Sequence, residues 1–169
     1  MQTLLPDCSV RKLQPVNADI EKIYAMASQN TLFYQYHPPF VTWQSILDDM
    51  SALPPDKTMA DKFYIGFFDG AALVAVVDMI LAYPNETTGY IGFFMVDKSR
   101  QGQGIGSRIL ADIENTMRNN GMCHSRLAVD KGNPQSYSFW TKNGYAVCGP
   151  EIPNDFSAYI PMQKELTPL

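Results

Sequence analysis

The stretch RQGQGIGSRIL, residues 100–110, places three glycines at alternate positions directly before a helix-like pattern. Glycine lets the backbone approach another group closely, because it has no Cβ atom, and it adopts conformations that other residues avoid. The N-terminus of a helix presents free N–H groups and favours negative charge. The sequence therefore predicts a phosphate-binding loop that contains Gly102, Gly104 and Gly106.

Three strand-like segments precede this loop. The first two, residues 62–68 (KFYIGFF) and 71–82 (AALVAVVDMILA), are joined by the dipeptide Asp69-Gly70, which is typical of hairpins. The turn-rich residues 83–89 (YPNETTG) then lead into the third segment, residues 90–96 (YIGFFMV). We expect three consecutive antiparallel strands that end at the glycine loop.

The segments on either side of these strands complete the predicted fold. Strands are expected at residues 9–13, 123–129, 144–149 and 156–163, and helices at residues 133–143 and after the caps Asn17 and Thr42. The helix after the loop has one apolar face and can end at Gly121; this face comprises Ile105, Ile109, Leu110, Ile113 and Met117. The predicted order is β-α-α-β-β-β-α-β-α-β-β. It describes an α/β fold with a mixed, mostly antiparallel sheet of about seven strands and helices on both faces, in a single domain of residues 1–169.

Composition narrows the class of protein. The chain has a net charge of −4, and 46% of its residues are hydrophobic, which suits a globular fold and argues against a nucleic-acid partner. Its three cysteines show no metal-site spacing, so we expect reduced thiols and no metal. The first residues do not resemble a signal peptide, and the longest apolar run contains Asp78. We therefore expect a cytoplasmic protein with no membrane partner.

Three known phosphate-binding motifs are candidates for the glycine loop. A Walker P-loop requires a lysine that is missing here. A dinucleotide fingerprint would have Ser107 in place of its third glycine, although Asp130 lies where a ribose-binding acid would be expected. The antiparallel strands argue against this second motif, but an NAD(P)-dependent oxidoreductase remains an alternative.

The third motif, Arg/Gln-x-x-Gly-x-Gly/Ala, is matched by Gln101, Gly104 and Gly106, and NPQSYSFWTKNGY follows at residues 133–145. In these features the chain resembles the GNAT superfamily of acyl-CoA-dependent N-acyltransferases, most strongly over residues 90–145. The resemblance implies an N-acetyltransferase that moves the acetyl group of acetyl-CoA to a primary amine of a small molecule or peptide. A catalytically silent CoA-binding module is a further alternative, and a homodimer is possible in this family.

The resemblance also implies where CoA would bind. The strand that ends in Val96 would separate from its neighbour and leave backbone groups of Phe94 and Val96 free for the pantetheine arm. Gln101 stands where many relatives have arginine, so Arg100 or Arg108 would neutralise the phosphates. The implied cofactor-binding residues are Phe94, Met95, Val96, Gln101, Gly102, Gln103, Gly104, Ile105, Gly106, Ser107, Asn133 and Trp140.

The loop glycines have a purely structural alternative, a tight connection between strand and helix, and two further residues have one as well. Asn133 would hold the pantetheine amide, or it would only cap the helix that starts at Pro134. Trp140 would line the thiol tunnel, or it would belong to the core. Trp140 also occupies the position at which many relatives have a tyrosine that acts as general acid and protonates the leaving thiolate. Tyr137, one turn earlier in the same helix, is therefore the candidate general acid.

Asp78 is the candidate general base, because an apolar strand would raise the pKa of its carboxyl group. The alternatives are a structural carboxylate paired with a cation, or a water chain without a dedicated base. We interpret His37 and His124 as structural histidines. Asp48, Asp49, Asp56 and Asp61 are interpreted as a solvated face.

The aromatic segment NTLFYQYHPPF, residues 30–40, is the candidate acceptor site. In relatives the segment between the first two helices lines this site. Phe33, Tyr34, Tyr36 and Phe40 would then favour an amine with apolar or aromatic bulk. The alternative is that these rings only seal the first two helices against the sheet.

Overall fold

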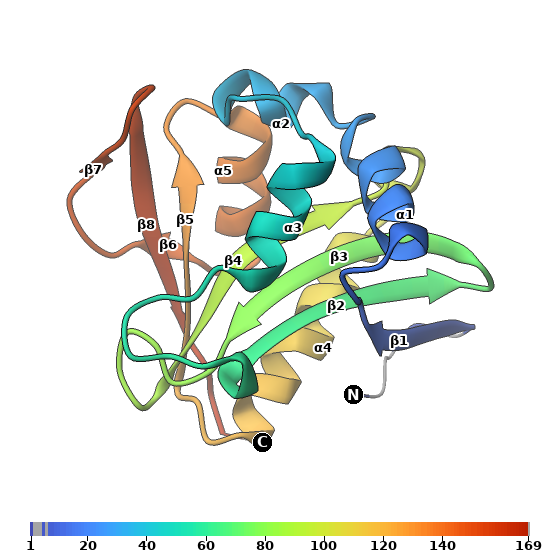
Figure 1. Ribbon diagram of the computed structural model, residues 1–169. Coiled ribbons are helices and arrows are strands. Elements are labelled where there is room, and N and C mark those ends of the chain that lie inside the picture. The colour runs from blue at the N-terminus through green and yellow to red at the C-terminus, as the bar shows by residue number, and fades with distance from the viewer. Residues whose placement is uncertain (2–4, 6, 169) are drawn as a thin grey trace.

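The computed structural model describes residues 1, 5 and 7–168 of the chain. It confirms the predicted α/β class: an eight-stranded sheet with helices on both faces (Figure 1). The strand order is β1-β2-β3-β4-β5-β8-β6, with β7 paired to β8. The elements are β1 (Cys8–Lys12), α1 (Asn17–Ala27), α2 (Thr31–Tyr36), α3 (Trp43–Ser51), β2 (Lys62–Asp69), β3 (Ala72–Ile80), β4 (Thr88–Val96), α4 (Ile105–Asn119), β5 (His124–Asp130), α5 (Pro134–Lys142), β6 (Ala146–Val147), β7 (Ile152–Pro153) and β8 (Ala158–Glu165).

Most predicted helix boundaries are confirmed, and the predicted cap at Asn17 is wrong. Helix α1 begins at Asn17, and its N-cap is Val16, which has no capping side-chain bond. Thr42 does cap α3, because its hydroxyl accepts from the backbone N–H of Ser45 (3.0 Å) and the Ser45 hydroxyl accepts in return (2.9 Å). Gly121 follows the end of α4 with φ +81°, a conformation that suits glycine.

Besides two 3-10 helices, Met59–Asp61 and Lys98–Arg100, two short elements were not expected from the sequence. Helix α2 forms within the aromatic segment, and β7 forms before the last strand. Both are too short for a periodic pattern to reveal them. Ring contacts accompany α2: Phe33 lies 5.0 Å from Tyr34 and 5.9 Å from Phe93 of β4, between ring centroids.

The sheet separates between β4 and β5. Antiparallel pairing joins β2, β3 and β4 in chain order, as predicted. Strand β1 also pairs antiparallel with β2, whereas β4 and β5 are parallel. Their pairing ends at Ile91 and Leu127, although β4 continues to Val96 and β5 to Asp130. The register between β3 and β4 shifts beside Asp78, and an irregularity of this kind bends a strand. The separation that the family resemblance implied is therefore present.

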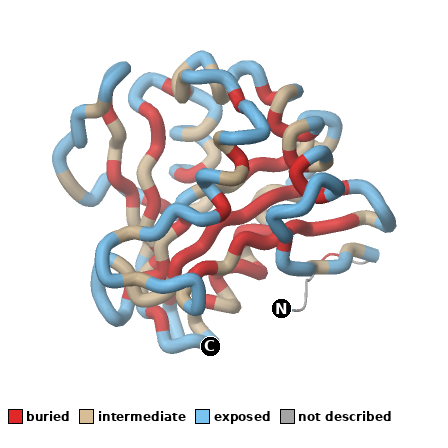
Figure 2. The backbone as a smooth tube through the Cα atoms, in the orientation of Figure 1, coloured by how far each residue is buried: buried red, intermediate tan, exposed pale blue. Residues whose placement is uncertain are grey.

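Apolar side chains fill both faces of the sheet, which explains why the central strands are buried along most of their length (Figure 2). Helices α1 and α3 cover one face and contribute Ile20, Ile23 and Ile46 to its core. Helix α4 covers the opposite face, where Ile109 and Trp140 of α5 belong to the same core cluster. The loop before α4 is thereby held against the end of β4.

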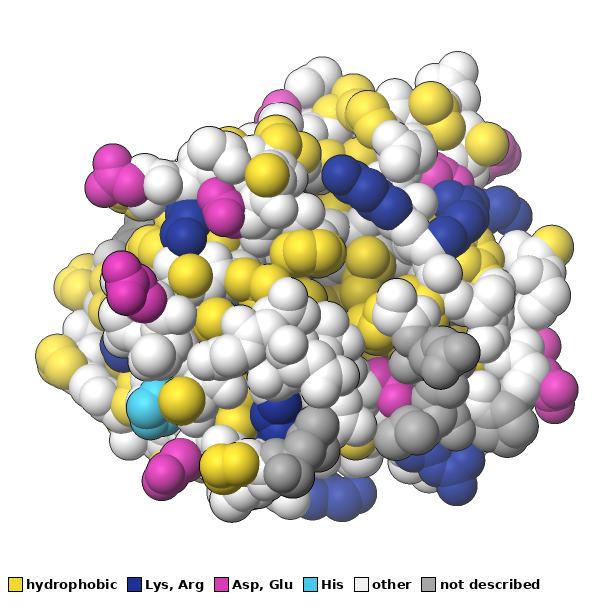
Figure 3. Space-filling model, turned by 90° about the horizontal axis from the view of Figure 1, so that it is seen from below, with side chains coloured by type: hydrophobic (Ala, Val, Ile, Leu, Met, Phe, Trp, Pro, Cys, Tyr) yellow, Lys and Arg dark blue, Asp and Glu magenta, His cyan; other side chains and the backbone are white. Residues whose placement is uncertain are grey.

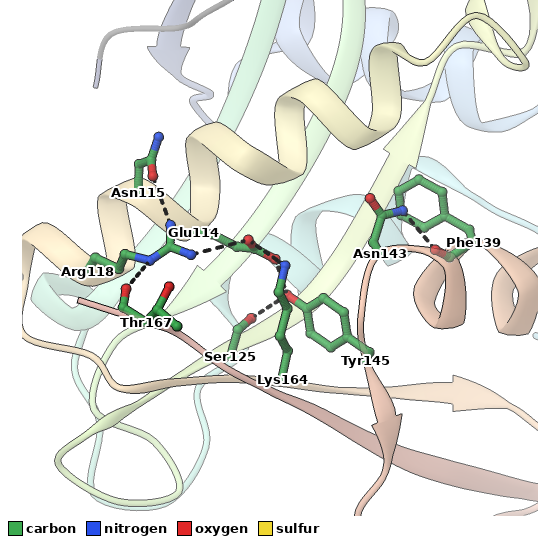
Figure 4. Close-up of polar contacts among 9 residues, drawn as sticks. All are labelled: Glu114, Asn115, Arg118, Ser125, Phe139, Asn143, Tyr145, Lys164 and Thr167. Atoms are coloured by element: carbon green, nitrogen blue, oxygen red, sulfur yellow. Dashed lines mark hydrogen bonds and ion pairs between the residues drawn. The ribbon is translucent and has the colours of Figure 1, made fainter. Parts of the chain in front are cut away.

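A buried polar network braces α4 against the last strands (Figure 4). The carboxylate of Glu114 accepts from Lys164 Nζ of β8 (2.9 Å to each oxygen) and from the hydroxyl of Tyr145 (3.2 Å). The same hydroxyl lies 2.7 Å from Ser125 Oγ of β5. Burial raises the pKa of Tyr145, which therefore stays a neutral hydrogen-bonding group. Paired in this way, the buried carboxylate ties α4, β5 and β8 together.

Charged side chains are mixed on the face seen from below (Figure 3). Lys and Arg side chains are interspersed with Asp and Glu side chains across this face, and hydrophobic side chains are exposed near its middle. Among the described residues, none of the helices combines the length and hydrophobicity that a membrane-spanning segment needs.

Candidate functional site

A first cavity of about 430 Å³ opens where β4 and β5 separate. Its lining combines the end of β4, the loop that follows it and one side of α5. The lining residues are Asn30, Phe33, Phe94, Met95, Val96, Gln101, Gly102, Gly104, Gly106, Ser107, Gln135, Ser136, Ser138, Phe139, Trp140 and Lys142.

The glycine loop, residues 101–107, presents backbone to this cavity. Gly102 and Gly104 have φ values of +75° and +78°, and a Cβ atom added at either would meet nothing within 4 Å. Gly104 is the N-cap of α4, and the N–H of Arg108 donates to its carbonyl oxygen (3.2 Å). The N–H groups of the residues before Arg108 lie in the first turn of α4, where N–H groups have no hydrogen-bond partners within the helix. This geometry suits an anion such as a pyrophosphate.

Gly106 serves a different purpose from the other two glycines. A Cβ atom there would lie 3.0 Å from Cε2 of Phe139 and 3.4 Å from its Cζ. Because Gly106 has no Cβ atom, α4 can pack closely against α5. The alternate glycines that looked equivalent in the sequence thus divide into two that free the backbone and one that allows helix packing.

Gln101 connects three elements around the first cavity. Its Nε2 donates to Asn30 Oδ1 (2.6 Å) and to the carbonyl oxygen of Val96 (2.9 Å), and its Oε1 accepts from Gln135 Nε2 (3.1 Å). The Val96 carbonyl, which we expected to be free for a ligand, is therefore occupied. A neutral side chain here joins the N-cap residue of α2 to β4 and α5. An arginine could not accept the bond from Gln135.

Four of the predicted cofactor-binding and catalytic residues do not line either cavity described here. Gln103 donates to the carbonyl oxygen of Ser99 (3.1 Å). Asn133 is buried, and its Oδ1 accepts from the N–H groups of Gln135 (3.1 Å) and Ser136 (3.2 Å), so the capping role is confirmed. The others are Ile105, which packs against the core, and Tyr137, which is 45% exposed.

The cation beside the first cavity differs from the expected ones. Arg100 forms an ion pair with Asp69 (2.9 Å), and neither Arg100 nor Arg108 lines the cavity. Lys142, in the last turn of α5, does line it. No local pattern in the sequence pointed to Lys142, because it lies two turns beyond the start of its helix.

A second cavity of about 340 Å³ lies beside the first. The two cavities share four lining residues, Phe33, Phe94, Ser136 and Trp140, which we call the shared wall. Aromatic rings pack closely here: Phe94 of the shared wall meets Trp140 edge-on at 5.6 Å and stacks on Phe139, outside the wall, at 5.5 Å, between ring centroids. The other residues around the second cavity are His37, Asp49, Ala52, Asp78, Tyr90, Ile91, Gly92, Phe93, Leu127, Ala128, Val129, Asp130 and Tyr159.

Of the four predicted acceptor residues, Phe33 lines both cavities. Tyr34 packs against Phe33 and Phe40 with ring centroids 5.0 and 5.1 Å away, and burial raises its pKa to about 12. The ring of Tyr36 lies over Gly132, and Phe40 is 45% exposed. These three side chains do not line either cavity described here, so only Phe33 is placed to touch a ligand in them.

Asp78 lines the second cavity and is also held in an ion pair. Its Oδ2 lies 2.8 Å from Lys62 Nζ, which additionally donates to the carbonyl oxygen of Ala52 (2.9 Å). Burial raises the pKa of the Asp78 carboxyl group, and the bond to Lys62 opposes that change. The paired structural carboxylate that we considered as an alternative is therefore present.

His37 and Asp130 form a pair that the sequence did not predict. Nδ1 of His37 lies 3.0 and 3.1 Å from the two carboxylate oxygens of Asp130, and both residues line the second cavity. The bond to Asp130 raises the pKa of His37 although burial opposes it. The two residues are far apart in sequence, so no local pattern could join them.

Asp49, which we expected on a solvated face, is exposed and also borders the second cavity. Its side chain lies at the second cavity, where desolvation and the nearby charge of Asp78 raise the pKa of its carboxyl group. Within the part of the chain that the structure describes, no group of three His, Cys, Asp or Glu side chains is arranged to hold a metal ion.

Comparisons with known proteins agree with this architecture. A family model described as "Acetyltransferase (GNAT) family" matches residues 21–145. Ard1 from Thermoplasma volcanium superimposes with a TM-score of 0.71 at 22% identity, covering 96% of this chain and 99% of that one. An acetyltransferase from Thermus thermophilus gives 0.73 at 17% identity, with 95% and 98% covered.

A third structure in the comparison contains a ligand. PaiA N-acetyltransferase from Thermoplasma acidophilum, in complex with coenzyme A, gives a TM-score of 0.68 at 19% identity, with 95% of this chain and 99% of that chain covered. At these identities the structures establish the fold, and the family model establishes the family. A search of curated proteins finds no match.

Proposed function

We propose, because the chain belongs to the acetyltransferase (GNAT) family, that it transfers the acetyl group of acetyl-CoA to a primary amine of a small molecule or peptide. One observation carries this proposal: the two cavities meet at the shared wall, where β4 and β5 separate. A donor and an acceptor bound on the two sides would be held next to each other, which lowers the entropic cost of their reaction.

The first cavity fits acetyl-CoA. Gly102 and Gly104 leave open space beside free N–H groups of the first turn of α4, as a pyrophosphate requires, and Lys142 supplies a positive charge. The PaiA relative contains coenzyme A, which supports this assignment. When bound, acetyl-CoA supplies the acetyl group as a thioester: the N–C bond forms as the C–S bond breaks, and the departing thiolate takes up one proton.

The second cavity suits a protonated amine. Three carboxylates, Asp49, Asp78 and Asp130, line it, whereas Lys62 compensates only Asp78. Aromatic rings of Phe33, Phe93, Tyr90 and Tyr159 complete the lining. A cation over such rings gains about 0.5–2 kcal/mol, and the carboxylates add Coulomb attraction. A cavity of about 340 Å³ is the size of typical small-molecule sites.

The test is a screen of primary amines with acetyl-CoA, in which release of the CoA thiol is measured. We expect release with amines that carry apolar or aromatic bulk. The matched control is the N,N-dimethyl derivative of each active amine, which keeps the positive charge but has no proton to lose after attack. It should release no thiol.

Two results would contradict the proposal. Saturable binding of acetyl-CoA without thiol release for any amine would favour a CoA-binding module without turnover. Stoichiometric binding of NAD(P) and not of CoA would favour an oxidoreductase.

A further inference from the structure

We propose that His37, oriented by Asp130, is the general base that removes a proton from the acceptor amine in the second cavity. This inference rests on the proposed function and names the catalytic group that the sequence did not reveal. Asp130 is a positioning residue in this scheme, since it acts through the imidazole and not on the substrate.

The geometry fixes the tautomer of His37. Both oxygens of Asp130 lie within 3.1 Å of Nδ1, and an ionised carboxylate only accepts hydrogen bonds. Nδ1 must therefore carry a proton, so Nε2 of the neutral ring has the free lone pair. A carboxylate behind an imidazole also raises its basicity. This is the arrangement that a general base requires.

The surroundings hold the imidazole at the cavity. Its ring centroid lies 5.1 Å from that of Phe33, which belongs to the shared wall, and 6.3 Å from that of Tyr159 on β8. The Asp130 side chain is only 9% exposed, whereas that of His37 is 43% exposed. The ring is therefore anchored on one side and open to cavity and solvent on the other.

The charges around the second cavity favour the same assignment. Besides Asp130 of β5, the groups that line it are Asp49 of α3, Asp78 of β3, Tyr90 of β4 and Tyr159 of β8, while Lys62 of β2 pairs with Asp78. Asp130 and Asp49 both stabilise the imidazolium form of His37. The proton that His37 receives is thus stabilised by negative charges already in place.

The proton balance of the step is simple. The acceptor enters as an ammonium ion, and Nε2 of neutral His37 takes one proton from it. The products are a neutral amine, whose lone pair is free to attack a carbonyl carbon, and an imidazolium paired with Asp130. The exposed part of the ring then returns this proton to water. No oxidant, reductant or metal enters the step.

Asp78, the base expected from the sequence, is less suited to this step. One of its oxygens is fixed by Lys62 at 2.8 Å. The other oxygen is shut off from solvent and has no hydrogen-bond partner among the described residues. An amine in the cavity would reach His37 without breaking an ion pair.

Two substitutions test the proposal, and the second histidine provides the control. His37→Gln should lower kcat/KM for the amine by about 100-fold or more, the usual contribution of a general base, and leave the KM for acetyl-CoA unchanged. It should also remove the rise of kcat/KM with pH that the imidazole produces. His124→Gln, which alters the other histidine of the chain, on β5, should keep both the rate and the pH profile of the wild type.

Asp130→Asn separates positioning from catalysis. Because the bond to Asp130 raises the pKa of His37, its loss should move the acid limb of the kcat/KM profile to lower pH, while the rate on the plateau falls. An independent readout is an NMR titration without any substrate. In the His124→Gln background the spectrum contains one imidazole, and its titration midpoint should fall when Asn replaces Asp130.

The outcomes distinguish the two levels of the argument. If the wild type releases thiol with an amine and His37→Gln does so within threefold of its rate, the general base is not His37 and the proposed function stands. If the acid limb stays in place in Asp130→Asn, Asp130 does not orient the base. If the wild type acetylates no amine, both the function and its base are wrong.

Discussion

The two cavities lie on either side of one wall but are built by different means. The first is lined by backbone of the glycine loop, where Gly102, Gly104 and Gly106 border it, together with the end of β4 and one side of α5. The second is lined by residues of α2, α3, β3, β4, β5, α5 and β8 and of the segments next to them. A site that consists of backbone groups is encoded by one short stretch of sequence. A site that consists of side chains from several strands forms only when residues distant in the sequence come together in the fold.

The difference has a chemical counterpart. The phosphates of coenzyme A are the same for every member of a family that uses it. Backbone N–H groups at a helix N-terminus bind phosphate without the help of particular side chains, and glycine is needed only for the backbone conformation. Specificity for an acceptor needs individual carboxylates and rings in defined positions. We therefore expect substitutions in the glycine loop to act through backbone conformation and those in the second cavity to act through single side chains.

The largest expected effect comes from Gly104→Val. The φ of +78° is costly for a β-branched residue, and the new side chain would fill the open space beside the free N–H groups. We expect affinity for acetyl-CoA to fall by about 100-fold or more, equivalent to about 2.7 kcal/mol. Ligand-induced thermal stabilisation should then disappear at concentrations that saturate the wild type.

Gly121→Val is the matched control for this substitution. Gly121 has φ +81°, nothing within 4 Å of an added Cβ, and lies at the opposite end of the same helix. Both variants should lose about 1–3 kcal/mol of folding free energy through backbone strain. Only Gly104→Val should lose acetyl-CoA binding. Equal affinities in the two variants would contradict the role of the glycine loop.

The sequence predicted the fold and the first cavity because the signals for both are local. Hydrophobic periodicity, the Asp69-Gly70 turn and the Thr42 cap each depend on neighbouring residues, and the structure confirms them. The glycine motif likewise pointed to the loop before α4, which lines the first cavity. Even there, the packing role of Gly106 was hidden, since it depends on Phe139 from another helix.

The second cavity could not be predicted in the same way. His37 and Asp130 are brought together only when α2 is placed over the end of β5. Asp49 is an exposed carboxylate, and nothing in its local sequence shows that it borders a cavity. Asp78 meets Lys62 only through the β2–β3 pairing. Aromatic composition pointed to the segment that contains Phe33. It did not distinguish Phe33, which lines the cavity, from Phe40, which does not.

A smaller effect is expected from Phe33→Ala, which tests the side-chain part of the comparison. Loss of this ring removes a surface over which a cationic amine can lie, so the KM for the amine should rise about tenfold, or about 1.4 kcal/mol. Phe40→Ala removes the same kind of ring from the same segment but outside the cavities. Its KM for the amine should equal that of the wild type. Steady-state kinetics with an identified amine gives both values. Equal KM values for the amine in the two variants would show that Phe33 does not contribute to the acceptor site.

The smallest expected effect concerns the pH dependence of stability, which should appear in the side-chain cavity and not in the glycine loop. Because Asp130 raises the pKa of His37 in the folded protein, their pairing stabilises the fold fully below the unfolded pKa of about 6.5. This stabilisation is lost as the pH rises through the folded pKa. Since the His37 side chain is 43% exposed, solvent screening limits the effect to less than about 1 kcal/mol.

The difference in unfolding free energy between wild type and His37→Gln, measured by urea denaturation, should therefore shrink as the pH rises from about 5.5 to about 8.5. The corresponding difference for Gly104→Val should stay constant, because backbone strain does not titrate. A His37→Gln difference that stays equally constant would mean that the imidazole gains nothing from Asp130 in the folded state.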